Sequence, residues 1–169
     1  MSENLIELIK NVKLLEGLNE KQLLRFAEKC KVSSFEKGET IIRAGDLTKD
    51  LYILITGICS VEVDVTKDVK HFVVEWVNPG DVFGEMSFFD GKPRSATVVC
   101  KESSKVVAIS AQNFKELINK ESDIGIAIMK NMALIFVKKI RGTHSKFKNL
   151  YWKGLVTTKS SSETQNGSL

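Results

Sequence analysis

Apolar residues recur with a helical period at both ends of the chain and with a period of two between them. Near the N-terminus the helical spacing predicts one amphipathic helix over residues 3–15, ended by Gly17. Asn19 can cap a second helix, with Gln22 three residues on as its capping-box partner. The predicted apolar face of that helix consists of Leu23, Leu24, Phe26, Ala27 and Cys30.

The middle of the chain alternates apolar and polar residues, as half-buried strands do. Val61, Val63 and Val65 alternate with Glu62 and Asp64, so we expect one buried face and one wet face. Glycines punctuate this segment at intervals of roughly ten residues, which is typical of an all-β barrel or roll; they are Gly38, Gly45, Gly57, Gly80 and Gly91. The predicted strands are 40–43, 51–55, 58–65, 70–77, 95–101 and 104–110, with a hairpin turn over 66–69.

The helical period returns after Ser110. We expect a short helix around residues 114–118 and a long one from about Ile124 to Tyr151. Along the long helix, apolar residues alternate spacings of four and three, the heptad seam of a coiled coil; the seam is Met129, Ala133, Phe136, Ile140, Thr143, Phe147 and Leu150. Gly142 and the polar Thr143 weaken this pattern.

The seam predicts a parallel homodimer, and the alternative is that its side chains pack on the chain's own sheets. The tail after it, residues 154–169, is polar and low in complexity, so we expect it to be disordered.

Composition places the chain among soluble proteins of one domain with extensions. Its 169 residues are 43% hydrophobic, enough to bury a core without disulfides. Cys30, Cys59 and Cys100 match no zinc spacing, so we expect reduced thiols in a cytoplasmic protein and no metal site. The charged N-terminus is not a signal peptide, and no apolar run reaches the roughly 18 residues of a membrane span.

The net charge of +4 conceals a division along the chain. Residues 1–123 hold 17 basic and 20 acidic side chains, whereas residues 124–162 hold 8 basic side chains and no acidic one. The simplest interpretation of the basic segment is a solvated lysine face. The alternatives are contact with nucleic acid, anionic lipid or an acidic partner.

The chemistry of the chain is concentrated between Gly84 and Val98, which read GEMSFFDGKPRSATV. A glycine lets backbone approach a ligand closely, and Glu85 after it can only accept hydrogen bonds. A single helical turn over 86–89 would present the free amides of Met86 and Ser87 to an anion. Arg94 offers a planar fork for phosphate oxygens, with the hydroxyl of Ser95 beside it.

A structural interpretation of the same residues is an ion pair between Glu85 and Arg94 that closes a loop. The phenylalanines of this stretch, Phe83, Phe88 and Phe89, are expected in the core.

The run FGEMSFFDGKPRSATV resembles, without a gap, the phosphate-binding cassette of the cyclic nucleotide-binding domain family. The segments GLNEKQLLRFAEKC, KGETIIRAGD, LYILITGICSVEV and NPGDVFGE resemble the family's first helix, its early strands and the approach to the cassette. The resemblance covers about residues 14–150.

The resemblance implies a mainly β fold, a jelly-roll-like β-roll of about eight strands with N-terminal helices and a long C-terminal helix. It divides the chain into N-terminal helices (1–31), the β-roll (32–110) with its cassette (83–98), C-terminal helices that form a lid or dimer contact (111–153), and the tail (154–169).

The resemblance also assigns roles within one bound cyclic nucleotide. Gly84 and Glu85 would meet the ribose, and Arg94 would bind the cyclic phosphate with Ser95 and the amides of Met86 and Ser87. A strand over 71–77 would wall the base, with Val73 and Val74 as the expected contacts, and Tyr151 and Trp152 are the aromatic candidates to cap it. Serine after the arginine resembles the bacterial catabolite activator family, which binds cyclic AMP, so we predict cyclic AMP over cyclic GMP, which stays open as a ligand.

The predicted function is that of a regulatory module, which repositions its C-terminal helix when it binds its ligand. The receiver of this signal would be a homodimer mate or an unknown downstream protein. One alternative is a transcription regulator of the catabolite activator type. No recognition helix follows Leu150 here, so specific DNA binding is not expected unless the chain is truncated. A second alternative is a scaffold that has lost its ligand. An enzyme is not expected, because His71 and His144 fall in no catalytic or metal-binding pattern.

Overall fold

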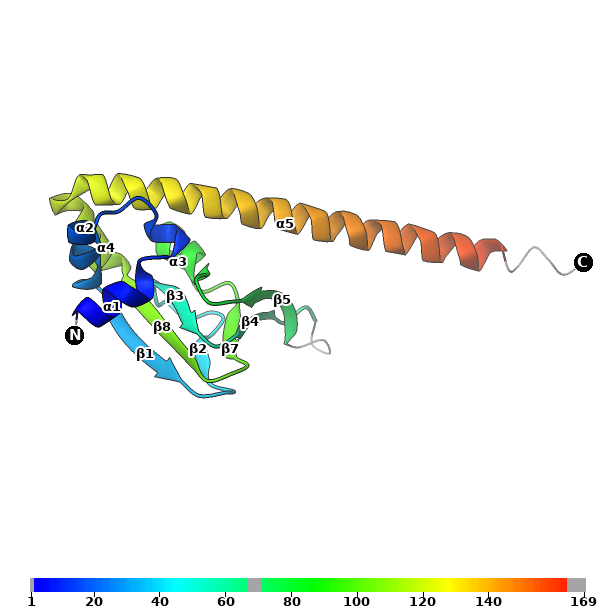
Figure 1. Cartoon of the computed structure of the whole chain (residues 1–169). Helices are drawn as coiled ribbons and strands as arrows, with labels where there is room; N and C mark the ends of the chain where they lie inside the picture. The colour runs from blue at the N-terminus through cyan, green and yellow to red at the C-terminus, as the bar shows by residue number, and fades with distance from the viewer. Residues whose placement is uncertain (1, 67–70, 164–169) are drawn as a thin grey trace, which may run out of the picture. The chain divides into compact units, whose positions relative to one another are not determined.

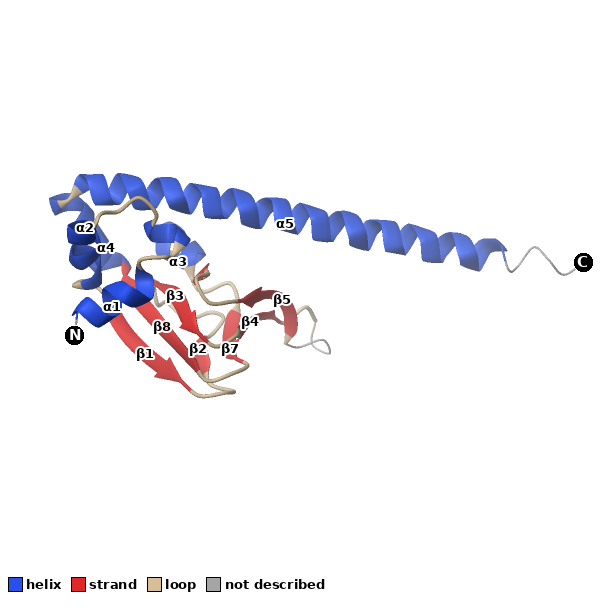
Figure 2. Ribbon diagram, viewed as in Figure 1, coloured by secondary structure: helices blue, strands red, loops and turns tan. Residues whose placement is uncertain are grey.

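Eight strands form two four-stranded antiparallel sheets in the computed structural model, which describes residues 2–66 and 71–163 (Figures 1 and 2). The strands are β1 (Lys31–Phe35), β2 (Thr40–Ile42), β3 (Asp50–Thr56), β4 (Cys59–Val63), β5 (Phe72–Val77), β6 (Val82–Phe83), β7 (Thr97–Cys100) and β8 (Ser104–Ser110). One sheet has the order β1-β8-β3-β6 and the other β2-β7-β4-β5. The expected β-roll of about eight strands with flanking helices is confirmed.

The core between the sheets consists of the inward-facing side chains of both. Leu54 and Val106 come from one sheet and Cys59, Val98 and Cys100 from the other, and none is more than 3% exposed. Cys59 and Cys100 are directly opposed on β4 and β7, with their sulfurs 3.9 Å apart as free thiols. The period of two read from the sequence therefore selects the side chains that form the core.

The outward face of β4 differs from the prediction that it is wet. Glu62 is only 4% exposed, because other polar groups cover its carboxylate. Ser60 donates to its Oε1 at 2.6 Å, Lys101 pairs with it at 2.7 Å, and the Nδ1 of His71 lies 3.3 Å from Oε2. An alternating strand thus has an apolar inner face and a buried polar cluster on its outer face.

The N-terminal helices are shorter than predicted. Instead of one helix over 3–15, α1 (Ser2–Ile9) is followed by an extended residue, Val12, and a 3-10 turn, η1 (Lys13–Leu15). Leu14 and Leu15 are consecutive residues of this 3-10 turn, and both are buried. The next helix, α2 (Glu20–Ala27), has the predicted capping box.

In that box Gln22 N donates to Asn19 Oδ1 at 3.0 Å, and Asn19 N donates to Gln22 Oε1 at 2.9 Å. The helices α1, α2 and α4 (Ala111–Lys120) lie together at one end of the sheets (Figure 1). The ion pair between Lys29 and Glu116, at 3.0 Å, joins the end of α2 to α4.

The last helix, α5 (Ser122–Glu163), is longer than the sequence pattern predicts. The expectation of disorder is wrong for residues 154–163, which continue the helix, because one glycine without a proline does not end it. Residues 164–169 lie outside the described residues. The chain divides into two compact units after Asn131, so most of α5 belongs to the second unit.

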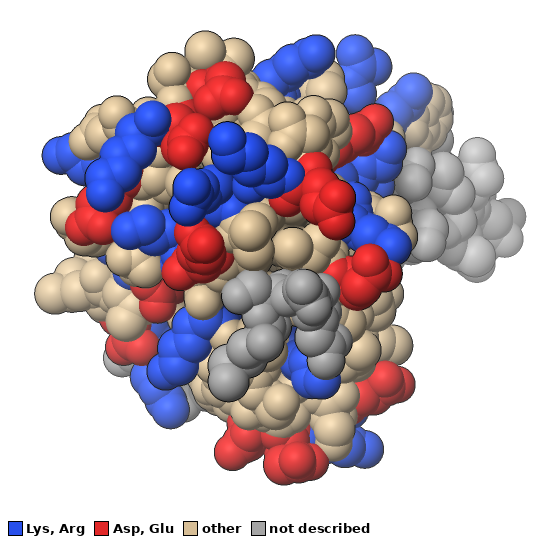
Figure 3. Space-filling view, turned by 60° about the vertical axis from the view of Figure 1, so that its left-hand side comes forward, with Lys and Arg blue, Asp and Glu red and all other residues tan. Residues whose placement is uncertain are grey.

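Acidic and basic side chains intermingle on the face of the molecule that Figure 3 displays. Among the described residues, no helix combines the length and the apolar character needed to cross a bilayer.

Candidate functional site

The predicted helical turn of the central stretch is present as α3 (Glu85–Asp90), which follows β6 directly. Glycines with positive φ bound it, Gly84 at 77° and Gly91 at 70°. A side chain at Gly84 has no room, because its Cβ would lie 2.8 Å from Arg94 Nη1 and 3.0 Å from the carbonyl oxygen of Asp50. Gly84 therefore allows both the left-handed turn and the close approach of the arginine.

Arg94 is the centre of this site, and it is only 4% exposed. Its Nη1 donates to the carbonyl oxygen of Gly84 at 2.8 Å, and its Nη2 donates to that of Asp50 at 2.9 Å. Its Nε donates to the hydroxyl of Thr48 at 3.0 Å. These bonds use three of the five guanidinium N–H groups, so one on each terminal nitrogen is left to meet an anion.

The backbone of Arg94 is also fixed. Its amide donates to the carbonyl of Asp46 at 2.8 Å, and its own carbonyl accepts from the amide of Gly45 at 2.8 Å. Its guanidinium lies over the ring of Tyr52, 5.8 Å from the centroid, and that ring stacks on Phe83 at 5.2 Å. The arginine is therefore held by the loop before β3 and by the core.

The charges around Arg94 oppose part of the effect that burial has on its pKa. Burial lowers the pKa of its guanidinium, while the nearby carboxylates of Asp50, Asp46 and Glu85 act in the opposite direction. Glu85, in the first turn of α3, acts on Arg94 through space, and no hydrogen bond of Arg94 described above involves it. The guanidinium donates to two backbone carbonyls and one hydroxyl, and Glu85 adds a negative charge near it.

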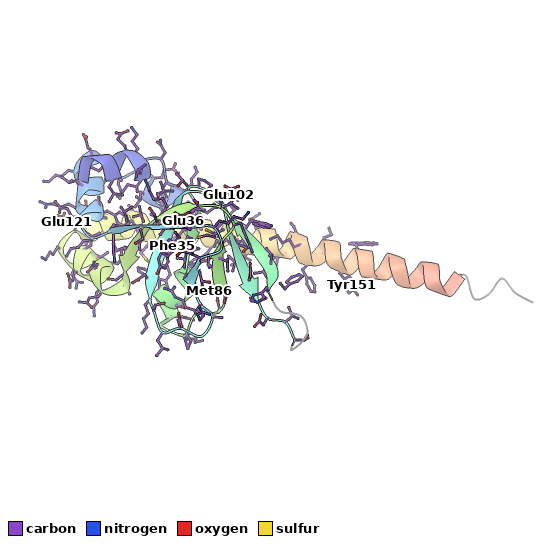
Figure 4. The ribbon with its side chains drawn as sticks, turned by 90° about the horizontal axis from the view of Figure 1, so that it is seen from below. Phe35, Glu36, Met86, Glu102, Glu121 and Tyr151 are labelled. Carbon is purple, nitrogen blue, oxygen red and sulfur yellow. The ribbon has the colours of Figure 1, made fainter. Side chains whose placement is uncertain are left out.

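The structure brings the remaining predicted cassette residues to one place. Ser95 is exposed, and its hydroxyl donates to the sulfur of Met86 at 3.4 Å. Met86, which Figure 4 labels, is 56% exposed, whereas Ser87 is buried. Of the three phenylalanines expected in the core, Phe83 and Phe88 are buried, but Phe89 is 38% exposed.

The register of β5 separates the two valines predicted to wall a base. Val61 packs against the core cluster and pairs with Glu75, while Glu62 on the other face pairs with Val73. The register shifts between these pairs, so Val74 is the extra residue of a β-bulge and stands with Glu75 opposite Val61. Val74, which is 39% exposed, therefore lies opposite Val61 on the inner face, whereas Val73 lies with Glu62 on the outer face.

Tyr151 and Trp152 project from α5 and are 62% and 59% exposed (Figure 4 labels Tyr151). They belong to the second unit, and a position over a base stays a prediction for both.

Sequence reasoning missed the residues that hold Arg94, namely Thr48, Asp50 and Tyr52. Two of the three groups that accept hydrogen bonds from Arg94 are the backbone carbonyls of Gly84 and Asp50, which any residue type supplies. Only the register of β3 against β6 and β8 could have indicated them. Within the part of the chain that the structure describes, no group of three or more His, Cys, Asp or Glu side chains could hold a metal ion.

Comparisons with known proteins show what the chain is similar to. The family described as "Cyclic nucleotide-binding domain" matches residues 32–121. A cAMP-dependent protein kinase regulatory subunit from Aspergillus niger is 32% identical over 116 residues, which are 69% of this chain and 27% of the relative. The cAMP-activated global transcriptional regulator CRP of Pasteurella multocida is 29% identical over 126 residues, 74% of this chain and 58% of the relative.

The solved structures show the same fold. A cyclic nucleotide-binding domain from Methylobacillus flagellatus superposes with a TM-score of 0.76 at 19% identity, covering 86% of this chain and 81% of that one. The regulatory subunit of a cAMP-independent protein kinase A from Trypanosoma cruzi, bound to guanosine, has a TM-score of 0.64 at 26% identity, covering 75% and 42%. The chain spans only about a quarter to three-fifths of the curated relatives described here.

Proposed function

Because the chain belongs to the cyclic nucleotide-binding domain family, we propose that it is a regulatory module that binds cyclic AMP in the cassette around Arg94. The observation that carries this proposal is the buried guanidinium, which three hydrogen bonds orient and which keeps two N–H groups for a cyclic phosphate. The ligand-free scaffold is a weaker alternative, because Gly84, Glu85, Arg94 and Ser95 are all present and close together.

In the proposed complex, different residues bind the phosphate, the ribose and the base of the nucleotide. Arg94 binds the phosphate, helped by Ser95 and the first-turn amides of Met86 and Ser87, and Glu85 accepts from the ribose 2′-hydroxyl. Val74, supported by its neighbour Val61, is the preferred wall for the base. Val73 is less suited to that role because its register places it on the outer face.

The preference for cyclic AMP over cyclic GMP rests on the serine at position 95 and on the relatives named for cAMP. A calorimetric panel of cyclic AMP, cyclic GMP and guanosine tests it, because the Trypanosoma cruzi relative was solved with guanosine. We expect cyclic AMP to bind most tightly. Tighter binding of guanosine, which has no phosphate, would contradict the role given to Arg94.

We further propose that the module catalyses no reaction and signals nucleotide binding through a conformational change of α5. A ligand shifts a conformational equilibrium only through its different affinity for two arrangements, and contacts from α5 to the base would supply that difference. Tyr151 and Trp152 are the candidates for such contacts. Incubation with cyclic AMP should leave the nucleotide intact, and appearance of AMP at a rate above the buffer's would refute this.

The heptad seam predicts a second copy of the chain as the receiver of this movement. Light scattering with and without cyclic AMP tests that homodimer.

A further inference from the structure

A narrow apolar stripe is exposed on the part of α5 that is orange in Figure 1. Four large side chains fall within an arc of about 80°, since consecutive residues of a helix advance by about 100°; they are Val137, Ile140, Phe147 and Tyr151. Each of them is between 47% and 70% exposed. Within this arc His144 is the polar residue. Large apolar side chains therefore meet water along about 21 Å of helix.

Exposed cations border the stripe on one side. Arg141 and Lys148 lie only about 20–40° beyond Val137 around the helix, and both are exposed. Trp152, which is also exposed, lies next to them at about 60°. This face of α5 thus combines aliphatic and aromatic side chains with a cationic border.

The charge of the surrounding segment has one sign. Residues 124–162 contain 8 basic and no acidic side chains, whereas both kinds are mixed over residues 1–123. Phe136, Lys139 and Lys146, which belong to the same stretch of α5, already have interaction partners, and the face defined here does not include them.

We propose that this face of α5 binds the surface of an anionic lipid bilayer, with the helix lying along the membrane plane. Ile140 and Phe147 would enter the boundary between headgroups and acyl chains, as the apolar face of an interfacial helix does. Long basic side chains beside such a face reach lipid phosphates while their stems stay on apolar surface, which is the position of Arg141 and Lys148. Tyrosine and tryptophan favour the same boundary.

A second copy of the chain fits this face less well. It would cover Ile140 and Phe147, but it would also bring together two segments that each carry 8 basic and no acidic side chains. Lipid phosphates neutralise that charge instead of doubling it. The bilayer therefore replaces the second copy as the occupant, and the inference does not depend on nucleotide binding.

A nucleic acid fits less well for a different reason. Its phosphates would neutralise Arg141 and Lys148, but binding through phosphates would leave Ile140 and Phe147 in water. A bilayer surface satisfies the charged and the apolar part of this face together.

The test uses the full chain without nucleotide. Cosedimentation compares vesicles of phosphatidylcholine with vesicles in which about one third of the lipid is phosphatidylserine, at physiological salt. We expect at least about tenfold tighter binding to the anionic vesicles. Equal binding to both kinds of vesicle, or binding to neither, would overturn the inference.

Tryptophan fluorescence locates the contact on the chain. The sequence has two tryptophans, so Trp76→Phe leaves Trp152 as the reporter in α5. We expect its emission to shift to shorter wavelength on anionic vesicles, because the indole leaves water. Binding without any shift would refute the placement of this face on the bilayer.

Two serine substitutions test the stripe. Ile140→Ser/Phe147→Ser should weaken binding to anionic vesicles at least about tenfold, because it removes the apolar anchors and keeps every charge. The control Val32→Ser/Leu47→Ser removes two exposed apolar side chains outside α5 and should change binding less than about threefold. Equal losses in both variants would refute a specific role for the stripe.

The cationic border has its own matched pair of variants. Arg141→Gln/Lys148→Gln should weaken binding about tenfold, whereas Lys115→Gln/Lys120→Gln makes the same charge change on exposed residues of α4 and should have less than about threefold effect. Equal losses would show that only net charge matters and would refute the assignment to this face.

The other occupants are outcomes of the same experiments. Sedimentation velocity should show a monomer at the concentration used, and a dimer that anionic vesicles cannot dissociate would refute the proposal. Tighter binding to duplex DNA than to anionic vesicles would also refute it. Circular dichroism of every variant confirms that α5 is retained.

Discussion

Arg94→Leu should produce two separable losses, one in the free protein and one in ligand binding. In the free protein, the carbonyl oxygens of Gly84 and Asp50 lose donors at 2.8 and 2.9 Å, and the hydroxyl of Thr48 loses one at 3.0 Å. A fully buried acceptor left without a donor costs about 1–3 kcal/mol. Gly84 and Asp50 are half-buried, so each carbonyl should cost toward the lower end of that range, and water can replace the bond to the exposed Thr48. We therefore expect a loss of about 2–4 kcal/mol in the free energy of unfolding without nucleotide.

The second loss is the affinity for cyclic AMP. Leucine leaves the phosphate without its charged partner in a site from which water is largely excluded, which costs about 2–5 kcal/mol. At about 1.4 kcal/mol for each factor of ten, this corresponds to a weakening of roughly 30-fold to several thousand-fold. Urea unfolding of the free protein measures the first loss, and calorimetric titration under folding conditions measures the second.

The control is Lys92→Met, which removes a positive charge from an exposed residue of the same loop. It should change neither quantity by more than about 0.5 kcal/mol. Unchanged affinity in Arg94→Leu would refute the assignment of the phosphate to this arginine. Unchanged stability together with lost affinity would instead show that the internal hydrogen bonds contribute little.

Three further predictions concern the glycine turn, the buried carboxylate and the helix cap. Gly84→Ala should weaken cyclic AMP binding at least about tenfold in titrations, because a Cβ would lie 2.8 Å from Arg94 Nη1 at a φ of 77°; wild-type affinity would contradict the close approach. Burial acts to raise the pKa of Glu62, but the hydrogen bonds from Lys101 and Ser60 outweigh it, so its pKa lies below the ordinary 4.5. The stability from Glu62 is then full above about pH 4.5 and lost as pH falls through the lowered pKa, so Glu62→Gln should cost about 1–3 kcal/mol in urea unfolding at pH 7 and less in acid. A difference that stays constant with pH would exclude this linkage. Asn19→Ala should lower the free energy of unfolding by about 1 kcal/mol through loss of the capping box, with the neighbouring exposed change Lys21→Ala as its control, and equal melting curves for both variants would show that the cap contributes nothing.

The sequence predicted those features whose causes are local. The capping box at Asn19 and the helical turn after Gly84 depend on residues within a few positions of each other, and both are present. The hairpin of β4 and β5 was predicted for the same reason, because alternation and turn residues lie side by side along the chain. Of the predicted turn 66–69, residues 67–69 lie outside the described residues.

Features that depend on distant pairing were missed. The strand β6 has two residues, Val82 and Phe83, which no pattern can indicate, and it is defined by its pairing with β3. β1 was also not predicted, because its residues Lys31–Phe35 are largely exposed and show little alternation of apolar character. The burial of Glu62 depends on Lys101 and His71, which approach it from other parts of the chain.

For the site, the sequence predicted residue types but no geometry. Arg94 was predicted to bind the anion, which stays a prediction, and the carbonyls that orient its guanidinium carry no signal in the sequence. The choice between Val73 and Val74 likewise depended on a β-bulge, which reverses the face that simple alternation assigns to a side chain.

The bonds of Arg94 to the loop at Gly45–Asp50 have a consequence for how the protein can respond to its ligand. A receptor group that is already ordered loses little conformational entropy on binding, so most of the phosphate's attraction is available as affinity. The same rigidity means that the cassette itself has little room to rearrange. We therefore expect any response of the rest of the molecule to originate at the base end of the nucleotide, and analogues altered only in the base should separate occupancy from response.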